Sequence, residues 1–343
     1  MSDIKHILVI RLSAMGDVAM TVPVLRAFSL QYPDVRVTVV SRPFFKPFFE
    51  GIPNLEFFAI DLNNRHKGSV GLLRLYHDLK RKNIDAVADL HNVLRSKVVR
   101  NLFALSGKIT AATDKGRKEK KALTRIKNKV FEPVKSMFDR HCDTFRKLGF
   151  PLDLSQSVFP EKREISKDVL SFSGAKSEKW IGIAPFAQFD SKVYPIDLMQ
   201  RVIDGLAQTE SKLFLFGGGE KEIQLLNQLK SNHSNVIVVA GKIKLPQEMD
   251  LISNLDVMLS MDSGNAHIAA MLGVKVITVW GATHPYAGFK PFNQPFAFCI
   301  TADRNKYPLI PTSVYGNKKV EGYEDAMQSI SPETVIDTIK KEL

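Results

Sequence analysis

The chain has 343 residues and carries 48 Lys and Arg against 36 Asp and Glu, a formal net charge of +12 at pH 7. Hydrophobic residues make up 44% and charged residues 24%, a balance that excludes a disordered or fibrous chain and predicts two globular domains at this length. Its two cysteines, Cys142 and Cys299, exclude a disulfide framework and a zinc cluster. Since the longest apolar runs are shorter than a membrane span and residues 1–11 lack the features of a secretory signal, we expect a reduced, cytoplasmic protein.

Strand-like and helical segments alternate through the first half of the chain. The strand-like runs are 6–12, 35–40, 55–60 and 84–90, and the helical patterns lie near 17–31, 43–50, 68–82 and 92–104. This alternation predicts a parallel, doubly wound sheet.

A basic segment follows. Residues 115–147 hold twelve Lys or Arg and four acids, so they carry two thirds of the net charge. Both a solvated loop and a surface for a polyanion explain such a run. Residues 115–130 contain no aromatic residue, which argues against single-stranded nucleic acid and favours anionic lipid headgroups or a phosphorylated substrate. We expect no nucleic-acid partner.

After a linker at 150–166 the alternation starts again. Strands are predicted at 180–186, 212–217, 235–241, 255–261 and 274–281, and helices near 195–209, 219–231, 246–253 and 264–272. The expected fold is α/β, with two Rossmann-like doubly wound domains facing a central cleft. The predicted boundaries are 1–165 for an N-terminal domain that includes the basic segment 115–130, 166–330 for a C-terminal domain, and 331–343 for a helix that packs across the junction.

The densest group of polar and small residues is LSMDSGNAHIAAMLGVKVITVWGATHPY, 259–286. A strand is predicted to end at Asp262, before a short loop and a helix that begins near His267. Backbone amides and the positive helix end would suit a diphosphate there, and Ser263 and Gly264 allow close approach. Asp262 and Ser263 could equally cap the helix, and His267 could be a core residue.

Two further sites follow strands of the second domain. Lys192 lies just before a helix that begins with Pro195, where its ammonium group could reach a phosphate. In FGGGEKE, 216–222, Glu220 could accept hydrogen bonds from a ribose or simply favour the helix N-terminus.

In the first domain, Asp17 follows Gly16 at a helix start. It would stabilise the first helical turn, and it could also act as a general base. Two neighbouring strands are predicted to end on the same rim, followed by Arg65, His66 and Lys67 after one and Asp89, His91 and Arg95 after the other. The sequence contains no GxxxxGK[ST], HExxH, GxSxG or DxD motif, so we expect no metal and no cofactor, with phosphate handled by lysine, amides and helix dipoles.

RLSAMGDVAMTVPVL together with MDSGNAHIAAMLGVKVITVWGATHP resembles the glycosyltransferase family 9 heptosyltransferases, and the resemblance spans the whole chain. Members transfer a heptose from ADP-heptose to the lipopolysaccharide inner core. The resemblance implies a GT-B fold, metal-independent inverting transfer, a nucleotide sugar as donor and an anionic phosphorylated glycolipid as acceptor. It implies a cytoplasmic enzyme, with peripheral association at the inner face of the inner membrane left open.

Carried over by position, the resemblance implies that Asp17 is the catalytic base and that Lys192 stabilises the leaving diphosphate. The residues expected to bind the donor are Glu220, Met261, Asp262, Ser263, Gly264, His267 and Thr283. Those expected to bind the acceptor are Ser13, Arg65, Lys67, His91, Arg95, Lys118, Lys120 and Lys121. The sequence departs from the family in having KVYP where K-x-W-P is common, and its long basic segment leaves the identity of the acceptor open.

Three alternatives remain open at this point. An enzyme of the same fold could use another nucleotide sugar, as a glycosyltransferase or an epimerase. A two-lobed protein could bind a small molecule without reaction. A nucleic-acid-binding protein is suggested by charge alone.

Overall fold

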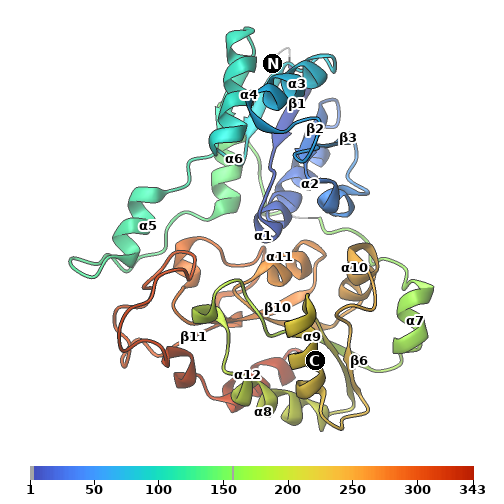
Figure 1. Ribbon diagram of the computed structural model, residues 1–343, viewed down its shortest axis with the longest axis vertical. Coiled ribbons are helices and arrows are strands. Elements are labelled where there is room, and N and C mark those ends of the chain that lie inside the picture. Colours follow the sequence, from blue (N-terminus) through green and yellow to red (C-terminus); the bar gives the residue numbers. More distant parts are fainter. Residues whose placement is uncertain (1–3, 157) are drawn as a thin grey trace. The chain divides into compact units, whose positions relative to one another are not determined.

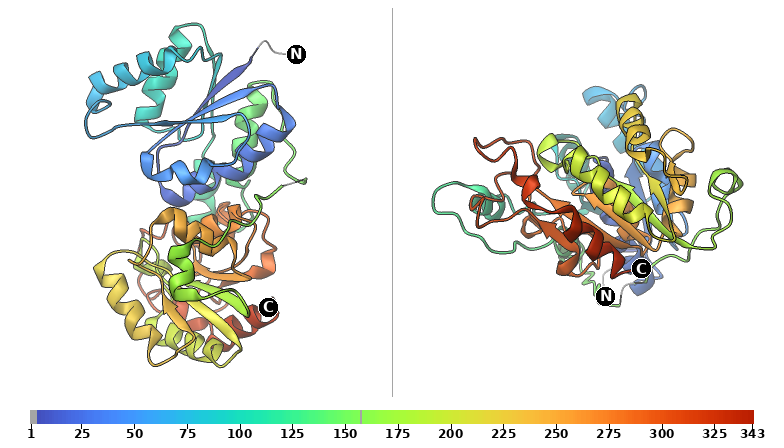
Figure 2. Two further views of the ribbon diagram at one scale, coloured as in Figure 1. Left: turned by 90° about the vertical axis from the view of Figure 1, so that its right-hand side faces the viewer. Right: turned by 90° about the horizontal axis from the view of Figure 1, so that it is seen from below.

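The computed structural model describes residues 4–156 and 158–343 (Figure 1). The chain folds into two units. The first unit comprises Met1–Gly116 and Lys135–Phe159, and the second comprises Arg117–Val134 and Pro160–Leu343. Each unit is built on its own parallel sheet, with helices on both faces of the sheet (Figure 2).

The sheet of the first unit has the strand order β3-β2-β1-β4-β5, and every pair is parallel. Its strands are β1 (His6–Ile10), β2 (Arg36–Ser41), β3 (Leu55–Ala59), β4 (Ala86–Asp89) and β5 (Ile109–Ala112). Its helices are α1 (Met15–Ala19), α2 (Thr21–Gln31), α3 (Gly68–Lys80), α4 (Leu94–Leu105) and α6 (Met137–Lys147).

After His6, the central strand β1 is apolar on both sides, and the whole strand is buried. On one face Leu8 packs in a cluster with Leu72 of α3 and Phe103 of α4. Helices α2 and α6 contact one another through the rings of Phe28 and Phe145, whose centroids are 4.8 Å apart. Helices thus cover the faces of the sheet, and loops follow the carboxyl ends of its strands.

The sheet of the second unit has the order β11-β10-β9-β6-β7-β8, again all parallel. Its strands are β6 (Lys179–Ala184), β7 (Ser211–Leu215), β8 (Val236–Val238), β9 (Val257–Met261), β10 (Lys275–Trp280) and β11 (Cys299–Thr301). Its helices are α5 (Arg117–Thr124), α7 (Lys167–Ser173), α8 (Ile196–Ala207), α9 (Glu220–Lys230), α10 (Leu245–Ser253), α11 (Gly264–Met271) and α12 (Pro332–Lys340).

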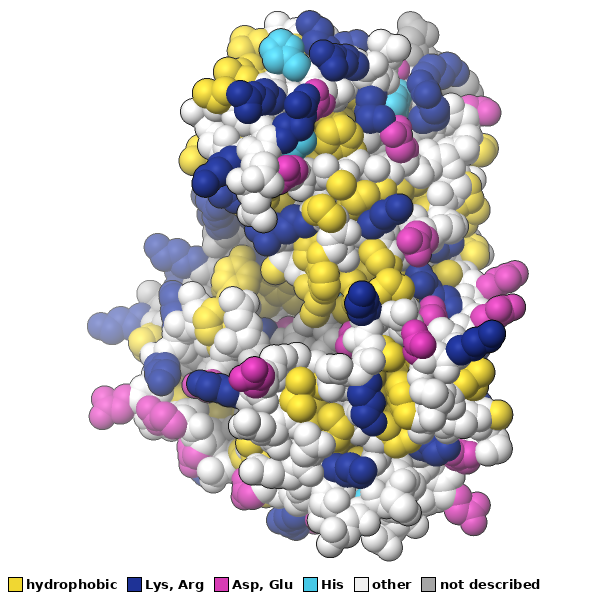
Figure 3. Space-filling view, turned by 45° about the vertical axis from the view of Figure 1, so that its right-hand side comes forward, with side chains coloured by type: hydrophobic (Ala, Val, Ile, Leu, Met, Phe, Trp, Pro, Cys, Tyr) yellow, Lys and Arg dark blue, Asp and Glu magenta, His cyan; other side chains and the backbone are white. Residues whose placement is uncertain are grey.

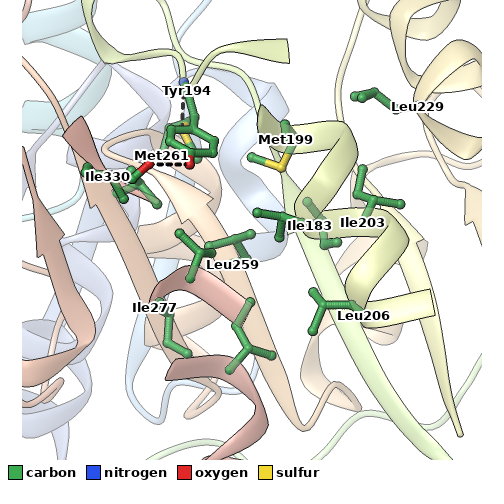
Figure 4. Packing of buried hydrophobic residues seen from close by; sticks show 14 of the residues in the cluster. Ile183, Tyr194, Met199, Ile203, Leu206, Leu229, Leu259, Met261, Ile277 and Ile330 are labelled. Atoms are coloured by element: carbon green, nitrogen blue, oxygen red, sulfur yellow. Dashed lines mark hydrogen bonds between the residues drawn. The ribbon is translucent and has the colours of Figure 1, made fainter. Parts of the chain in front are cut away.

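The core of the second unit packs strand residues such as Ile183 and Leu259 against Met199 and Ile203 of α8 (Figure 4). Tyr194 is fully buried in this cluster: its backbone N–H donates to the sulfur of Met261 at 3.3 Å and its hydroxyl donates to the carbonyl of Ile330 at 2.6 Å. Burial raises the pKa of Tyr194 to about 12. The tyrosine of KVYP therefore joins the loop after β6 to β9 and to the segment before α12.

Every predicted strand is present, and most of the strand ends lie within two residues of the predicted ones. Two short outer strands, β5 and β11, and three helices, α5, α6 and α7, were not predicted. Outer strands of four and three residues carry too few side chains for a periodic signal. The predicted helix at 43–50 is a 3₁₀ helix, Pro43–Phe49, with Pro47 inside it.

The predicted domain division is wrong in one respect: the basic segment does not belong to the first unit. Residues Arg117–Val134, which we call the arm, are part of the second unit, and the chain returns to the first unit at Lys135. The third and last crossing lies between Phe159 and Pro160, six residues before the predicted boundary at 165. A charged segment with few apolar residues has no pattern that indicates which core it joins.

The final helix packs on α8 of its own unit, and the expected packing across the junction stays a prediction. Ile336 approaches Gly205 so closely that a Cβ there would lie 2.6 Å from it, and Arg201 pairs with Glu333 at 2.8 Å. Val335 and Ile339 are buried in the same cluster as Tyr194. Among the helices of residues 4–156 and 158–343, none is long and apolar enough to cross a bilayer.

Candidate active site

Both sheets contain a point where the strand order reverses. In the second unit β6, β7 and β8 follow one another on one side, and β9 returns to the other side of β6. In the first unit the corresponding point lies between β1 and β4. Ligands of doubly wound sheets bind outside the carboxyl ends of the strands at such points. Lys192 follows β6 and Asp262 follows β9, while Asp17 follows β1 and His91 follows β4.

At the second unit's reversal point, three predicted residues meet at one carboxylate oxygen. Lys192 Nζ lies 3.2 Å from Asp262 Oδ2, and the Thr283 hydroxyl donates to the same oxygen at 2.9 Å. The side chains of Lys192 and Asp262 are only 12% and 11% exposed. Asp262 therefore fixes the ammonium group of Lys192 and joins the loops after β6, β9 and β10.

The N-terminus of α11 lies directly beside this carboxylate in the chain. The helix begins at Gly264, as the predicted range 264–272 has it and three residues before the start near His267 that the motif suggested. Ser263 is its N-cap residue but makes no side-chain cap, because its hydroxyl pairs with that of Ser260 at 3.1 Å. The first-turn amides and the helix dipole thus provide anion-binding chemistry next to Lys192. His267 and Met261 are buried in the same strand–helix unit.

A loop that sequence reasoning missed holds the stem of Lys192. Gly316 has φ +85°, and a Cβ at this glycine would lie 2.7 Å from Cγ of Lys192. The Ser191 hydroxyl donates to the Gly316 carbonyl at 2.6 Å, and the Ala282 N–H donates to the Ser191 carbonyl at 3.1 Å. Only a glycine fits so close to the lysine in this backbone conformation, but a single glycine in a loop gives no warning of it in the sequence.

The glycine-rich turn after β7 is held by Glu222, and Glu220, whose binding to a ribose stays a prediction, starts the next helix. Glu222 Oε2 accepts the N–H of Gly218 at 2.7 Å, while Glu220 is exposed as the first residue of α9. The spacing of the two glutamates, two residues apart, could not distinguish the one that bonds the loop from the one that faces solvent.

In the first unit, Asp17 is paired with a buried arginine that the prediction did not include. Arg11 Nη2 lies 2.8 Å from Asp17 Oδ2, and Arg11 Nη1 donates to the Leu90 carbonyl at 2.7 Å. The Ala14 N–H donates to the same carboxylate oxygen at 3.3 Å. Arg11 thus joins the loops after β1 and β4 and orients Asp17. The signal that could have revealed it is an arginine at the end of the apolar run HILVIR.

His91 lies next to this pair at the end of β4. Its backbone N–H donates to Asp89 Oδ1 at 3.1 Å, and Arg100 pairs with the other oxygen of Asp89 at 3.2 Å. Burial, followed by the positive charge of Arg11, lowers the pKa of His91 to about 3, so its ring is neutral near pH 7. Ser13 is partly exposed in the loop before Asp17. The structure brings Ser13, Asp17 and His91 to the loops at the reversal point of the first sheet.

The other residues predicted to bind the acceptor are not part of this group. Arg65 makes two hydrogen bonds of 2.7 Å to Asp78, which raise the pKa of Arg65, in a loop after the outer strand β3. Lys67 is the exposed N-cap of α3, and Arg95 is exposed in the first turn of α4. Lys118, Lys120 and Lys121 lie in α5, hence in the second unit, which corrects their expected place in the N-terminal domain.

Among the described residues, no group of three or more His, Cys, Asp or Glu is arranged to hold a metal ion. The chemistry that the two loop groups offer is a buried lysine beside the N-terminus of a helix in one unit, and an oriented carboxylate in the other. The first suits a diphosphate and the second can accept a proton.

Comparisons with known proteins relate the chain to one family. The sequence model of Glycosyltransferase family 9 (heptosyltransferase) matches residues 72–311. The lipopolysaccharide core heptosyltransferase OpsX of Haemophilus influenzae is 24% identical over 287 residues, which cover 82% of this chain and 80% of that protein.

Two solved structures share the fold. The glycosyl transferase family 9 structure from Veillonella parvula has a TM-score of 0.77 at 20% identity and covers 100% of this chain and 98% of its own. E. coli heptosyltransferase WaaC with ADP-2-deoxy-2-fluoro heptose has a TM-score of 0.68 at 18% identity, covering 98% of this chain and 100% of its own. The predicted GT-B fold is thereby confirmed.

Proposed function

The chain belongs to glycosyltransferase family 9, the heptosyltransferase family, and from this premise we propose that it transfers heptose from ADP-heptose to the inner core of lipopolysaccharide, by an inverting and metal-independent reaction. The observation that carries the proposal is the meeting of Lys192, Asp262 and Thr283 at one oxygen beside the N-terminus of α11. The name of the H. influenzae relative supports the acceptor, and the ligand of the E. coli structure supports the donor.

In this proposal the diphosphate of the donor binds at Lys192 and the first-turn amides of α11. The ammonium group of Lys192 and the amides of α11 place positive charge beside the diphosphate, which gains negative charge as its bond to the sugar breaks. Asp262 does not touch the diphosphate. It holds Lys192 in place through the 3.2 Å contact, so it is a positioning residue.

Asp17 is the general base of the proposed reaction. The acceptor hydroxyl gives its proton to the Asp17 carboxylate, and its oxygen forms a bond to the anomeric carbon of the heptose. The bond between that carbon and the diphosphate oxygen breaks, and ADP leaves with the electron pair. Attack from the side opposite the leaving group inverts the anomeric centre. Arg11, at 2.8 Å, fixes the orientation of the carboxylate.

The test is the Asp17→Asn variant, with Asp34→Asn as the matched control because Asp34 is an exposed carboxylate of the same unit. Asp17→Asn is expected to bind ADP as the wild type does, since the donor residues lie in the other unit. Transfer from ADP-heptose is expected to fall by at least ~100-fold, the usual contribution of a positioned base. ADP binding is measured by calorimetry and transfer by release of ADP. Unchanged turnover in this variant would overturn the role of Asp17.

A further inference from the structure

The arm, Arg117–Val134, has two sets of positive side chains with different surroundings. It holds seven Lys or Arg and two Glu, a net charge of +5. Two of the cations are turned inward and are used to attach the arm. The other five are exposed, namely Arg117, Lys118, Lys121, Arg125 and Lys127.

The attachment of the arm is specific. Lys120 is 4% exposed and its ammonium group lies 4.0 Å from the centre of the Phe289 ring. Lys129 Nζ donates to the carbonyl of Leu123 at 2.6 Å and to that of Pro311 at 2.8 Å. Burial lowers the pKa of Lys129 to about 8, with a smaller contribution from the charge of Arg304.

Aromatic contacts complete the attachment. The centre of the Phe131 ring lies 4.8 Å from that of Tyr286 and 5.0 Å from that of His284, and the guanidinium carbon of Arg304 lies 3.2 Å from the Phe131 ring centre. The Val134 N–H donates to the Tyr286 carbonyl at 2.9 Å. The arm is therefore an ordered part of the second unit and not a solvated loop.

The outer surface of the arm combines charge with an exposed apolar side chain. Lys118 and Lys121 of α5, and Arg125 directly after it, recur at helical spacing on the side away from the buried residues of the helix, Lys120 and Leu123. The loop after the helix folds back onto it, because the Val130 N–H donates to the Ala122 carbonyl at 3.1 Å. This loop presents Ile126, 64% exposed, between Arg125 and Lys127.

The position of the arm makes this surface accessible. Helix α5 and the following loop lie at the edge of the second unit, away from its sheet (Figure 1, Figure 2). On the face drawn in Figure 3, Asp and Glu side chains lie among those of Lys and Arg. On the arm only Glu119 and Glu132 accompany the cations.

We infer that the outer surface of the arm docks on the anionic headgroups of a lipid bilayer, with Ile126 entering the interface. Each basic side chain near an anionic membrane surface strengthens binding about fivefold. An apolar side chain beside basic ones adds hydrophobic burial at the boundary between headgroups and acyl chains. A phosphate on the glycolipid acceptor would attract the same charges but would give Ile126 no apolar environment, so the isoleucine favours the membrane. This inference extends the proposed function, since a membrane-borne acceptor requires the enzyme at the membrane surface.

The test compares the triple variant Arg117→Gln, Arg125→Gln, Lys127→Gln with a control of equal charge change, Lys318→Gln, Lys340→Gln, Lys341→Gln, whose lysines are exposed in the same unit. Co-sedimentation is measured with vesicles of phosphatidylethanolamine and phosphatidylglycerol and with vesicles of phosphatidylcholine, over a range of NaCl concentrations. Wild type and control are expected to bind the anionic vesicles only, more weakly as salt rises. The arm variant is expected to bind at least tenfold more weakly.

A second pair of variants tests the apolar contribution. Ile126→Ser is expected to weaken binding several-fold, whereas Ile109→Ser, at a 55% exposed position of β5, is expected to leave it unchanged. The inference is overturned if wild type does not bind anionic vesicles, if the arm variant binds as the control does, or if binding appears only when lipopolysaccharide is added. Vesicle binding needs no turnover, so a failed transfer assay with intact vesicle binding would count against the proposed function alone.

Discussion

Asp262 accepts contacts from two side chains of neighbouring loops, and its carboxylate is almost wholly enclosed. Such a carboxylate contributes to stability by holding the side chains of Lys192 and Thr283 in place. Without Lys192, the buried carboxylate of Asp262 would lose the positive charge beside it and would keep the hydrogen bond from the Thr283 hydroxyl. Breaking a buried ion pair on one side destabilises strongly for this reason.

We expect Lys192→Ala and Asp262→Asn each to lower the free energy of unfolding of the second unit by about 3 kcal/mol. In the double variant no charge is left unpaired, so the loss should be smaller than the sum by about 1–3 kcal/mol. Urea unfolding followed by tryptophan fluorescence measures this directly, because both tryptophans, Trp180 and Trp280, are buried in the second unit. The Lys212–Glu178 pair, 22% and 26% exposed, is the matched control, with a smaller coupling. Strict additivity for Lys192 and Asp262 would contradict the pairing.

At the scale of single residues, the sequence predicted residue types at strand ends better than it predicted partners. Asp17, Lys192 and Asp262 were found because each follows an apolar run at a reversal point of its sheet. Arg11 was missed because an arginine directly after an apolar run indicates only that a strand ends there. Glu222 was missed because hydrogen bonding to a glycine turn depends on backbone geometry, which two nearby glutamates do not reveal.

The loop after β10 is where a core strand, the arm and the candidate active site come together within the second unit. Thr283 contacts Asp262, and the next residue, His284, packs on Phe131 of the arm. His284 Nδ1 accepts the Tyr286 N–H at 3.1 Å. Burial above all, and then the charges of Arg304 and Lys129, lower the pKa of His284 to about 4.

This shift makes the stability of the second unit depend on pH. The folded state keeps His284 neutral down to about pH 4, whereas the unfolded chain protonates it below about pH 6.5, so stability falls as pH falls through this range. Between pH 7 and pH 5 we expect the contribution of His284 to fall by about 2 kcal/mol. His284→Asn keeps an acceptor for Tyr286 but does not titrate. Its urea midpoint by tryptophan fluorescence should therefore change less with pH than that of the wild type, and equal slopes would contradict the shift.

At the scale of elements, central strands and long helices could be predicted because burial on both faces or on one stripe imposes a period on the sequence. The arm could not. Its helix α5 buries only Lys120 and Leu123, so its pattern is one of charge, and its docking depends on a cation over Phe289 and an aromatic contact with His284. Neither contact has a signal in the local sequence.

For the molecule as a whole, the proposed chemistry uses positive groups of the protein itself in place of a divalent cation. Lys192 and the amides of α11 supply the charge at the diphosphate. We therefore expect heptose transfer from ADP-heptose to proceed at an unchanged rate in excess EDTA, measured as ADP release with and without added Mg²⁺. Loss of activity in EDTA that Mg²⁺ restores would show that the reaction needs a metal.

The two-unit organisation followed from the repeated alternation of strands and helices, and the last crossing, between Phe159 and Pro160, lies inside the predicted linker 150–166. The first excursion of the chain, from Gly116 to Lys135, was not foreseen. A segment without apolar periodicity can be assigned only to the domain of its neighbours in the sequence. For the arm this assignment is wrong, because its neighbours on both sides belong to the first unit.

That excursion has a consequence for the order in which the protein is made. The arm leaves the ribosome long before its docking site, since Lys129 and its acceptor at Pro311 are separated by 182 residues. At translation rates of 5–20 residues per second, this interval is roughly 10 to 40 s. The first unit can complete α6 during this time, with the arm still unattached. The net positive charge of the arm favours its hydration and opposes its association with other nascent chains until its docking site has formed.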